Sequence, residues 1–318
     1  MSKNLSGTSS DLSAGSFYLP RLSSKVLWSL QRAILPSLPP RWVKVQHIKT
    51  CLFAVIEKSY LCLTIYMHGI TQAPHPQLTF ATKLGFFHPV YCEDFVCAAE
   101  ISDGKWIAGA FDGCTMGTES HFASALAGKI LRKVAKEAGY EFFADPSLES
   151  RPLEDLGRDL LGRFRHQFRK TCSDLFLTKE EQLTTLVISL IDTRANAVWG
   201  ICAGDGYVST SVGAQEFDHG NIPNYMAYHW DKPFDEWLDD HTSTFRFSEV
   251  REVTLSTDGI FAFERMDKTK PFREVDVVDF ILGAKGSSPK ALKNQINVLE
   301  QEYGLVATDD VGVVRVRW

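Results

Sequence analysis

Several aspartates stand at the ends of short apolar runs that are typical of buried β-strands. The three that close such a run, each with a glycine after it, are Asp112, Asp205 and Asp258. Two further positions border an apolar run from the other side: Asp94 begins one, and the pair Asp309-Asp310 precedes the last one. A carboxylate at the end of a rigid strand is a fixed polar group at the edge of a sheet. These aspartates are therefore candidates for one shared site.

An Asp-Gly dipeptide is also the favoured turn of a β-hairpin. That explanation suffices for Asp103-Gly104, which lies between two apolar runs. It is weaker for Asp112, which a helical pattern follows, and for Asp258, which no clean return strand follows. Glycine beside such an aspartate lets a ligand or a metal ion approach the backbone closely.

Carboxylates that are brought together raise one another's pKa unless a cation offsets their charge. Oxygen ligands without histidine or cysteine partners suit Mg²⁺ or Mn²⁺. Two such ions can bind a shared water, lower its pKa and clamp a phosphoryl group for in-line attack. The spacing predicts this chemistry only if the strand ends converge, which the spacing alone leaves open.

Helices and paired strands must position these carboxylates. A helix is predicted over residues 120–138 with Gly139 as its stop, and a second one over residues 153–177. Their apolar stripes at helical spacing are Phe122, Leu126, Ile130 and Val134 in the first, and Leu156, Leu160, Phe164 and Phe168 in the second.

The remaining elements alternate between strand pairs and helices. The predicted strands are 94–101, 106–111, 184–191, 197–203, 253–256 and 312–317, and the further helices are 275–282 and 289–303. Residues 213–247 are predicted to form a long polar and aromatic excursion with a short helix at 233–240, and loops of that length are usually functional. Strands in pairs with helices between the pairs favour an α+β fold of antiparallel sheets covered by helices.

Composition narrows the function classes. The 318 residues are 44% hydrophobic and 23% charged, which is the balance of a globular protein, and the net charge of −5 gives no basic surface for nucleic acid. The apolar stretch at residues 51–67 carries Glu57 and Lys58 near its middle and is short, so we expect no membrane span. Seven cysteines without a Cys-x-x-Cys pair predict free thiols in a reducing, cytoplasmic compartment.

From Leu84 to Trp318 the chain resembles the metal-dependent protein phosphatases of the 2C type, as a divergent, bacterial-like member. No single motif is specific, and the order and intervals of the motifs carry the resemblance. The motifs are Cys92-Glu93-Asp94, Asp112-Gly113-Cys114-Thr115-Met116, Thr184-Thr185-Leu186-Val187, Gly204-Asp205-Gly206, Thr257-Asp258-Gly259 and Asp309-Asp310.

The resemblance implies a four-layer αββα sandwich, which we place over residues 76–318. Residues 1–75, which are Ser-rich at first and then broken by prolines, are predicted to be an N-terminal extension of uncertain order. The resemblance also implies two Mg²⁺ or Mn²⁺ ions and possible binding of a third. The implied metal ligands are Asp94, the bridging Asp112, the carbonyl of Gly113, Asp258 and Asp309, with Asp205 for the further ion. Asp112 and Asp258 would thereby be catalytic.

Some positions depart from the family pattern. Pro89 stands where the family carries an Arg that grips the substrate phosphate, and the adjacent His88 could partly replace it as a catalytic and substrate-binding residue. Thr115 and Met116 replace two glycines of the Asp-Gly-x-Gly-Gly loop, and Cys114 stands where some members carry a His. In the excursion, Asp218 and His219 resemble a common Asp-His pair that would contact substrate, although an ordinary structured loop explains them equally well.

The resulting prediction is hydrolysis of phosphoserine and phosphothreonine in proteins, with a cognate Ser/Thr kinase as a further partner. The alternative is a weak or inactive phosphatase-like domain that binds a phosphoprotein or a kinase. A small-molecule phosphatase would differ from the first reading only in its substrate.

Overall fold

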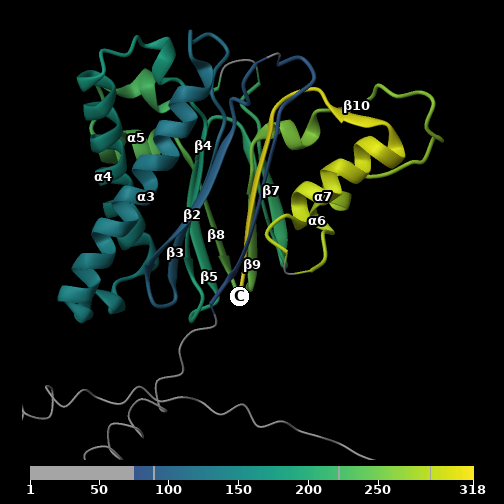
Figure 1. Cartoon of the computed structure of the whole chain (residues 1–318). Helices are drawn as coiled ribbons and strands as arrows, with labels where there is room; N and C mark the ends of the chain where they lie inside the picture. The colour runs from purple at the N-terminus through teal and green to yellow at the C-terminus, as the bar shows by residue number, and fades with distance from the viewer. Residues whose placement is uncertain (1–74, 89, 221–222, 287) are drawn as a thin grey trace, which may run out of the picture. The chain divides into compact units, whose positions relative to one another are not determined.

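Two five-stranded antiparallel sheets pack face to face, with helices on both outer faces (Figure 1). The computed structural model describes residues 75–88, 90–220, 223–286 and 288–318. The predicted extension at residues 1–75 lies outside the described residues except for its last residue, and so does Pro89. The predicted α+β fold of helices and antiparallel sheets is confirmed.

The first sheet has the strand order β2-β3-β4-β5-β8. Its strands are β2 (Phe95–Ser102), β3 (Lys105–Phe111), β4 (Leu186–Asp192), β5 (Ala197–Ala203) and β8 (Ser243–Ser248). All seven residues of β3 are buried because the strand is central and covered on both faces. Its one charged residue, Lys105, is neutralised by Asp192 at 2.7 Å.

The second sheet has the order β1-β12-β9-β6-β7. Its strands are β1 (Gln77–Lys83), β12 (Val311–Arg317), β9 (Glu252–Ser256), β6 (Gly206–Thr210) and β7 (Gly213–Phe217). A separate ribbon joins β10 (Phe263–Arg265) to β11 (Leu305–Ala307). The first and last described strands, β1 and β12, therefore pair with each other along their full length.

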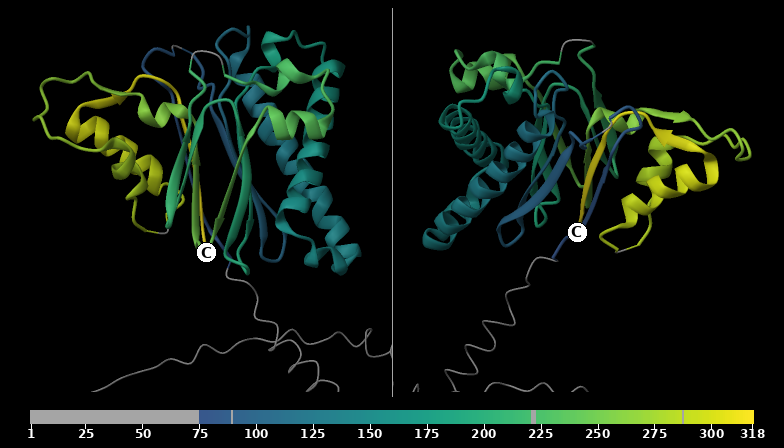
Figure 2. Two further views of the ribbon diagram at one scale, coloured as in Figure 1. Left: turned by 180° about the vertical axis from the view of Figure 1, so that it is seen from behind. Right: turned by 45° about the horizontal axis from the view of Figure 1, so that its top comes forward.

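The helices cover the two outer faces. α3 (Ser120–Ala144) and α4 (Leu153–Asp174) pack on the first sheet, and α6 (Val277–Leu282) and α7 (Ala291–Val298) lie on the far side of the second (Figure 2). A π-helical turn (Leu299–Tyr303) extends α7, and α5 (Phe234–Asp240) lies in the predicted excursion. No helix in the described ranges combines the length and the apolarity that crossing a bilayer would require.

Three apolar clusters separate the four layers. One lies between α3, α4 and the first sheet, one between the two sheets, and one between the second sheet and α6 and α7. The predicted stripe on α4, with Leu160, Phe164 and Phe168, is fully buried in the first cluster. The helical periodicity of the sequence therefore identified that outer interface.

The predicted end of α3 at Gly139 is wrong, because the helix continues to Ala144. A Cβ atom at Gly139 would lie 2.6 Å from the carbonyl oxygen of Ile101 in β2. Glycine at this position therefore permits the helix to pack closely on the strand, and it does not terminate the helix.

The predicted excursion at residues 213–247 contains more regular structure than expected. It holds the predicted short helix, found as α5, but also strands β7 and β8. Strands β1, β6, β10 and β11 were not predicted either. Four of the five residues of β7 are exposed, so this edge strand has no alternation of apolar and polar residues from which to identify it.

We predict that Phe164→Ala lowers the free energy of unfolding by about 3–5 kcal/mol, because the ring is fully buried between α4 and the first sheet. The matched control is Phe143→Ala on α3, whose ring is 89% exposed, and it should change stability by less than about 0.5 kcal/mol. Urea unfolding of both variants measures the difference. Equal effects would contradict the assigned helix faces.

Candidate active site

The first two aspartates are brought together by a single hairpin. Strands β2 and β3 are antiparallel, and Phe95 at the start of β2 is opposite Phe111 at the end of β3. Asp94 precedes the one strand and Asp112 follows the other, so the register places the two carboxylates side by side. The charge of Asp94 accordingly raises the pKa of Asp112, after burial.

The second sheet brings its own acidic residues to the same edge. Strand β9 pairs with β12, and beyond this ladder the backbone N–H of Thr257 donates to the carbonyl of Gly312 at 3.0 Å. Asp258 therefore follows β9 at the edge where Asp309 and Asp310 precede β12. The strand ends of both sheets converge, as the spacing of the aspartates required.

Asp94 and Thr257 link the two sheets. The Thr257 hydroxyl donates to Asp94 Oδ2 at 2.6 Å and accepts from the backbone N–H of Gly312 at 2.9 Å. Asp94 is only 5% exposed, and its other oxygen, Oδ1, is buried without a hydrogen-bond partner among the described residues. A buried carboxylate oxygen without a partner destabilises the folded state, and it could serve as a ligand to a cation.

Burial is the main cause of the raised pKa values in this cluster. It raises the pKa of Asp94 well above its ordinary value, and the charges of Asp310 and Asp258 raise it further. The pKa of Asp112 is raised in the same way, by burial and then by Asp94. Burial, followed by the charges of Asp309 and Asp205, raises the pKa of Asp258 to about 6. These groups interact electrostatically as one acidic cluster.

At the glycines after Asp112 and Asp258, two backbone segments lie in direct contact. A Cβ atom at Gly113 would lie 2.2 Å from the carbonyl oxygen of Ser120, and one at Gly259 would lie 1.7 Å from that of Asp310. Any larger residue would push these segments apart. The glycines are therefore needed to bring the acidic strand ends together. The sequence analysis predicted only that they give a ligand access to the backbone.

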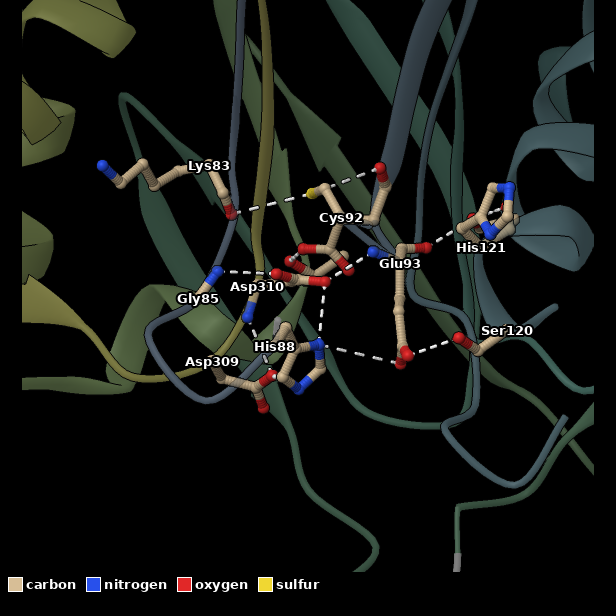
Figure 3. A network of polar contacts seen from close by, with 12 residues as sticks. Lys83, Gly85, His88, Cys92, Glu93, Ser120, His121, Asp309 and Asp310 are labelled. Carbon is tan, nitrogen blue, oxygen red and sulfur yellow. Dashed lines mark hydrogen bonds and ion pairs between the residues drawn. The ribbon is translucent and has the colours of Figure 1, made fainter. Parts of the chain in front are cut away.

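Asp310 holds two segments of the site together, a role that the sequence analysis did not predict. Its side chain is 1% exposed, and it accepts hydrogen bonds from the backbone N–H groups of Gly85 (2.6 Å) and Glu93 (Figure 3). Asp310 thereby fixes the segment before β2 to the segment before β12. The Asp-Asp doublet was the only sequence signal, and it does not reveal that one member is buried and the other half-exposed.

His88 lies among three carboxylates. Its Nε2 is 3.2 Å from Asp309 Oδ1, and its Nδ1 is 3.0 Å from Asp310 Oδ2 and 3.9 Å from Glu93 Oε2 (Figure 3). The two nearest contacts occupy both ring nitrogens. The phosphate contact predicted for His88 stays a prediction, and it would require one of these contacts to open.

A small pocket of ≈ 260 Å³ opens beside the cluster. It is lined by Asp205, Glu216, Phe217, Asp218, Asp258, Phe261, Ala262 and Asp309. Asp205, Asp218, Asp258 and Asp309 of the predicted set thus share this lining, whereas Asp94 and Asp112 do not reach it. Five of the eight lining residues are acidic and none is basic.

The predicted Asp218 and His219 differ in their contacts. Asp205, which is 8% exposed, holds His219 in place. Its Oδ1 accepts from the backbone N–H of His219 at 2.7 Å and lies 3.0 Å from the Nδ1 of His219. Asp218 is exposed and caps the backbone N–H of Gly220 at 2.7 Å. Only the position of His219 is therefore fixed by the acidic residues of the site.

Cys114 packs against Leu183, Tyr225 and Ala227. Burial, followed by the neighbouring Cys114, raises the pKa of Tyr225. Apolar packing accounts for a cysteine at this position.

Within the described ranges, no three His, Cys, Asp or Glu side chains are placed so that they could hold a metal ion as they stand. The cluster nevertheless fits a divalent cation in two respects: its donors are carboxylate oxygens, and Asp94 Oδ1 has no other partner. Burial and the charge of Asp94 raise the pKa of Asp112, which favours its protonated form. A cation would take the place of that proton, and the side chains would rotate to complete its shell.

We predict that Gly259→Ala destabilises the protein by at least about 2 kcal/mol, because the new methyl group would overlap the backbone of Asp310. Gly213→Ala is the matched control: no atom lies within 4 Å of the added carbon, and the change should stay within about 0.5 kcal/mol. The free energy of unfolding measures both. A tolerated Gly259→Ala would show that the strand ends are not in close contact.

We also predict that the metal-free protein loses stability as the pH rises from 3.8 to about 6, because Asp258 ionises less readily in the folded state than in the unfolded chain. Asp258→Asn should remove roughly 3 kcal/mol of this pH dependence. Urea unfolding in EDTA across that range is the measurement. If the wild type and the variant follow parallel curves, Asp258 is not buried beside other carboxylates.

Comparison with known proteins supports the fold. Neither protein-family models nor curated proteins match this chain. Among solved structures, a bacterial serine phosphatase is 14% identical, with 76% of this chain and 98% of that chain covered and a TM-score of 0.51. The serine/threonine phosphatase Stp1 from Staphylococcus aureus is 13% identical, with 77% and 96% covered and a TM-score of 0.48.

A third match is the PP2C phosphatase domain, with a fragment of the regulatory domain, of SpoIIE from Bacillus subtilis. It is 17% identical, with 78% of this chain and 64% of that chain covered and a TM-score of 0.46. The chain has the fold of the bacterial PP2C-type serine phosphatases, and the family resemblance drawn from the motifs is confirmed at the level of the fold.

Proposed function

We propose that this chain is a metal-dependent phosphatase that hydrolyses phosphoserine and phosphothreonine in proteins. The observation that carries the proposal is the convergence of Asp94, Asp112, Asp258 and Asp309 at one edge of two sheets. The PP2C-type fold is consistent with it.

The charge of the pocket argues that any phosphate bound there needs cations. Its described lining carries five carboxylates and no lysine or arginine, so a phosphate dianion alone would be repelled. Divalent cations beside the pocket would offset this charge, and one bound at Asp94 would satisfy its Oδ1. Mg²⁺ and Mn²⁺ are the ions that a carboxylate-only set favours.

Each residue has a distinct part in the proposal. Asp94 and Asp112 would hold the ions, with Asp112 bridging them and the Gly113 carbonyl as an additional ligand. Asp258 and Asp309 would complete the shell from the second sheet, and Asp205 would serve a further ion. Two bound ions would supply positive charge for the phosphoryl group and lower the pKa of a water for attack on phosphorus.

Exposed apolar side chains beside the site favour a protein substrate over a small metabolite. Phe86 and Phe87, which precede His88, are 60% and 65% exposed, and Tyr91 is 60% exposed. Large apolar side chains grouped at a surface are typical of contacts with another protein. Asp218 and His219 remain proposed substrate contacts at the pocket side, and a cognate kinase partner and a cytoplasmic location remain predictions.

We predict that the purified protein hydrolyses p-nitrophenyl phosphate and phosphopeptides with Mn²⁺ and loses this activity in EDTA. Asp112→Asn and Asp258→Asn should each lower kcat/KM at least about 100-fold, because each removes a charge that holds the ions. Asp103→Asn, in the Asp-Gly turn between β2 and β3, is the matched control and should retain activity. Activity that survives EDTA or both site variants would contradict the proposal.

The alternative is a phosphatase-like domain that binds a phosphoprotein or a kinase without catalysis. The replacement of the phosphate-gripping Arg by Pro89 and the absence of a preformed ligand set among the described residues favour it. Calorimetric titration of the wild type with Mn²⁺ separates the two: binding abolished by Asp112→Asn supports the enzyme, whereas no binding together with tight capture of a phosphopeptide supports the alternative.

A further inference from the structure

The loop between β1 and β2 is bound along its backbone to the segment before β12. Gly85 donates to Asp310, Phe86 to the carbonyl of Ala307 at 2.9 Å, and Phe87 to that of Thr308 at 3.3 Å. A Cβ atom at Gly85 would lie 2.3 Å from the carbonyl carbon of Asp309, so the two segments are in direct backbone contact. The loop that carries His88 therefore has a fixed position relative to Asp309.

The side chain of His88 lies between one buried and one exposed carboxylate. Asp310 is 1% exposed and holds Nδ1, whereas Asp309 is 49% exposed and contacts Nε2 (Figure 3). Asp310 is itself held by two backbone N–H groups. The order Asp310, His88, Asp309 thus runs from the rigid interior to the edge of the pocket.

Among the proposed metal ligands, Asp309 most needs contacts with other residues that fix the orientation of its side chain. Half of its side chain is exposed to water, and an exposed carboxylate samples several rotamers. Its Oδ1 contacts His88 Nε2 and accepts from the backbone N–H of Asp310 at 2.8 Å. Its Oδ2 has no partner among the described residues. The two contacts on Oδ1 fix the carboxylate and leave Oδ2 available.

We infer that His88 is a positioning residue that orients Asp309 for cation binding and is itself held in place by Asp310. This rests on the proposed function, and it assigns His88 a role toward the ions in place of direct contact with phosphate. Side chains that hydrogen-bond a metal-ligating group typically change metal affinity about 10- to 100-fold when they are replaced.

Replacing His88 by glutamine or by asparagine distinguishes the contact of Nε2 from that of Nδ1. In His88→Gln the amide can occupy the place of Nε2 and keep the contact with Asp309, whereas in His88→Asn it can occupy only the place of Nδ1. We predict that His88→Asn weakens Mn²⁺ binding about tenfold or more, while His88→Gln stays within about threefold of the wild type. Calorimetric titration with Mn²⁺ measures this without any catalytic turnover.

The control is His121→Asn, because His121 stacks on Tyr91, with ring centroids 4.4 Å apart, and contacts no carboxylate among the described residues. It should bind Mn²⁺ as the wild type does. Unchanged Mn²⁺ binding in both His88 variants, with a raised KM for a phosphopeptide, would overturn the inference in favour of a phosphate contact. Equal losses in both variants would also overturn it, whereas absence of Mn²⁺ binding by the wild type would refute the proposed function itself.

Discussion

The site depends on the burial of like charges where the two sheets meet. Asp94 and Asp112 come from one hairpin, Asp258 and Asp309 from the strand pair of the other sheet, and burial and mutual repulsion raise the pKa values of the first three. Such an arrangement destabilises a fold unless protons or cations neutralise it. The raised pKa values of Asp94 and Asp112 favour protonated carboxyl groups in the metal-free protein.

The surrounding structure holds the carboxylates together against their repulsion. Thr257 of the second sheet donates a hydrogen bond to Asp94 of the first. Asp310 fixes the segment before β2 by accepting hydrogen bonds from two of its backbone N–H groups. Gly113 and Gly259 allow backbone contacts that no side chain would tolerate. The strand ends are thus fixed by hydrogen bonds to hydroxyl and backbone groups, and the charge of the cluster is left for a ligand to compensate.

The sequence predicted those parts of the molecule that follow from local pattern. The stripe of Phe164 and Phe168 identified a helix and its buried face, and the Asp103-Gly104 turn identified the hairpin whose register joins Asp94 to Asp112. Strand β7 was missed because its residues are mostly exposed at a sheet edge. The role of Asp310 was missed because its burial depends on segments more than two hundred residues away in the chain.

A crystal structure of the protein soaked in Mn²⁺, with anomalous diffraction recorded at the manganese absorption edge, tests the central claim most directly. We expect anomalous peaks within about 2.0–2.4 Å of carboxylate oxygens of Asp94 and Asp112. The absence of manganese at this edge of the sheets would contradict a shared cation site of the four aspartates.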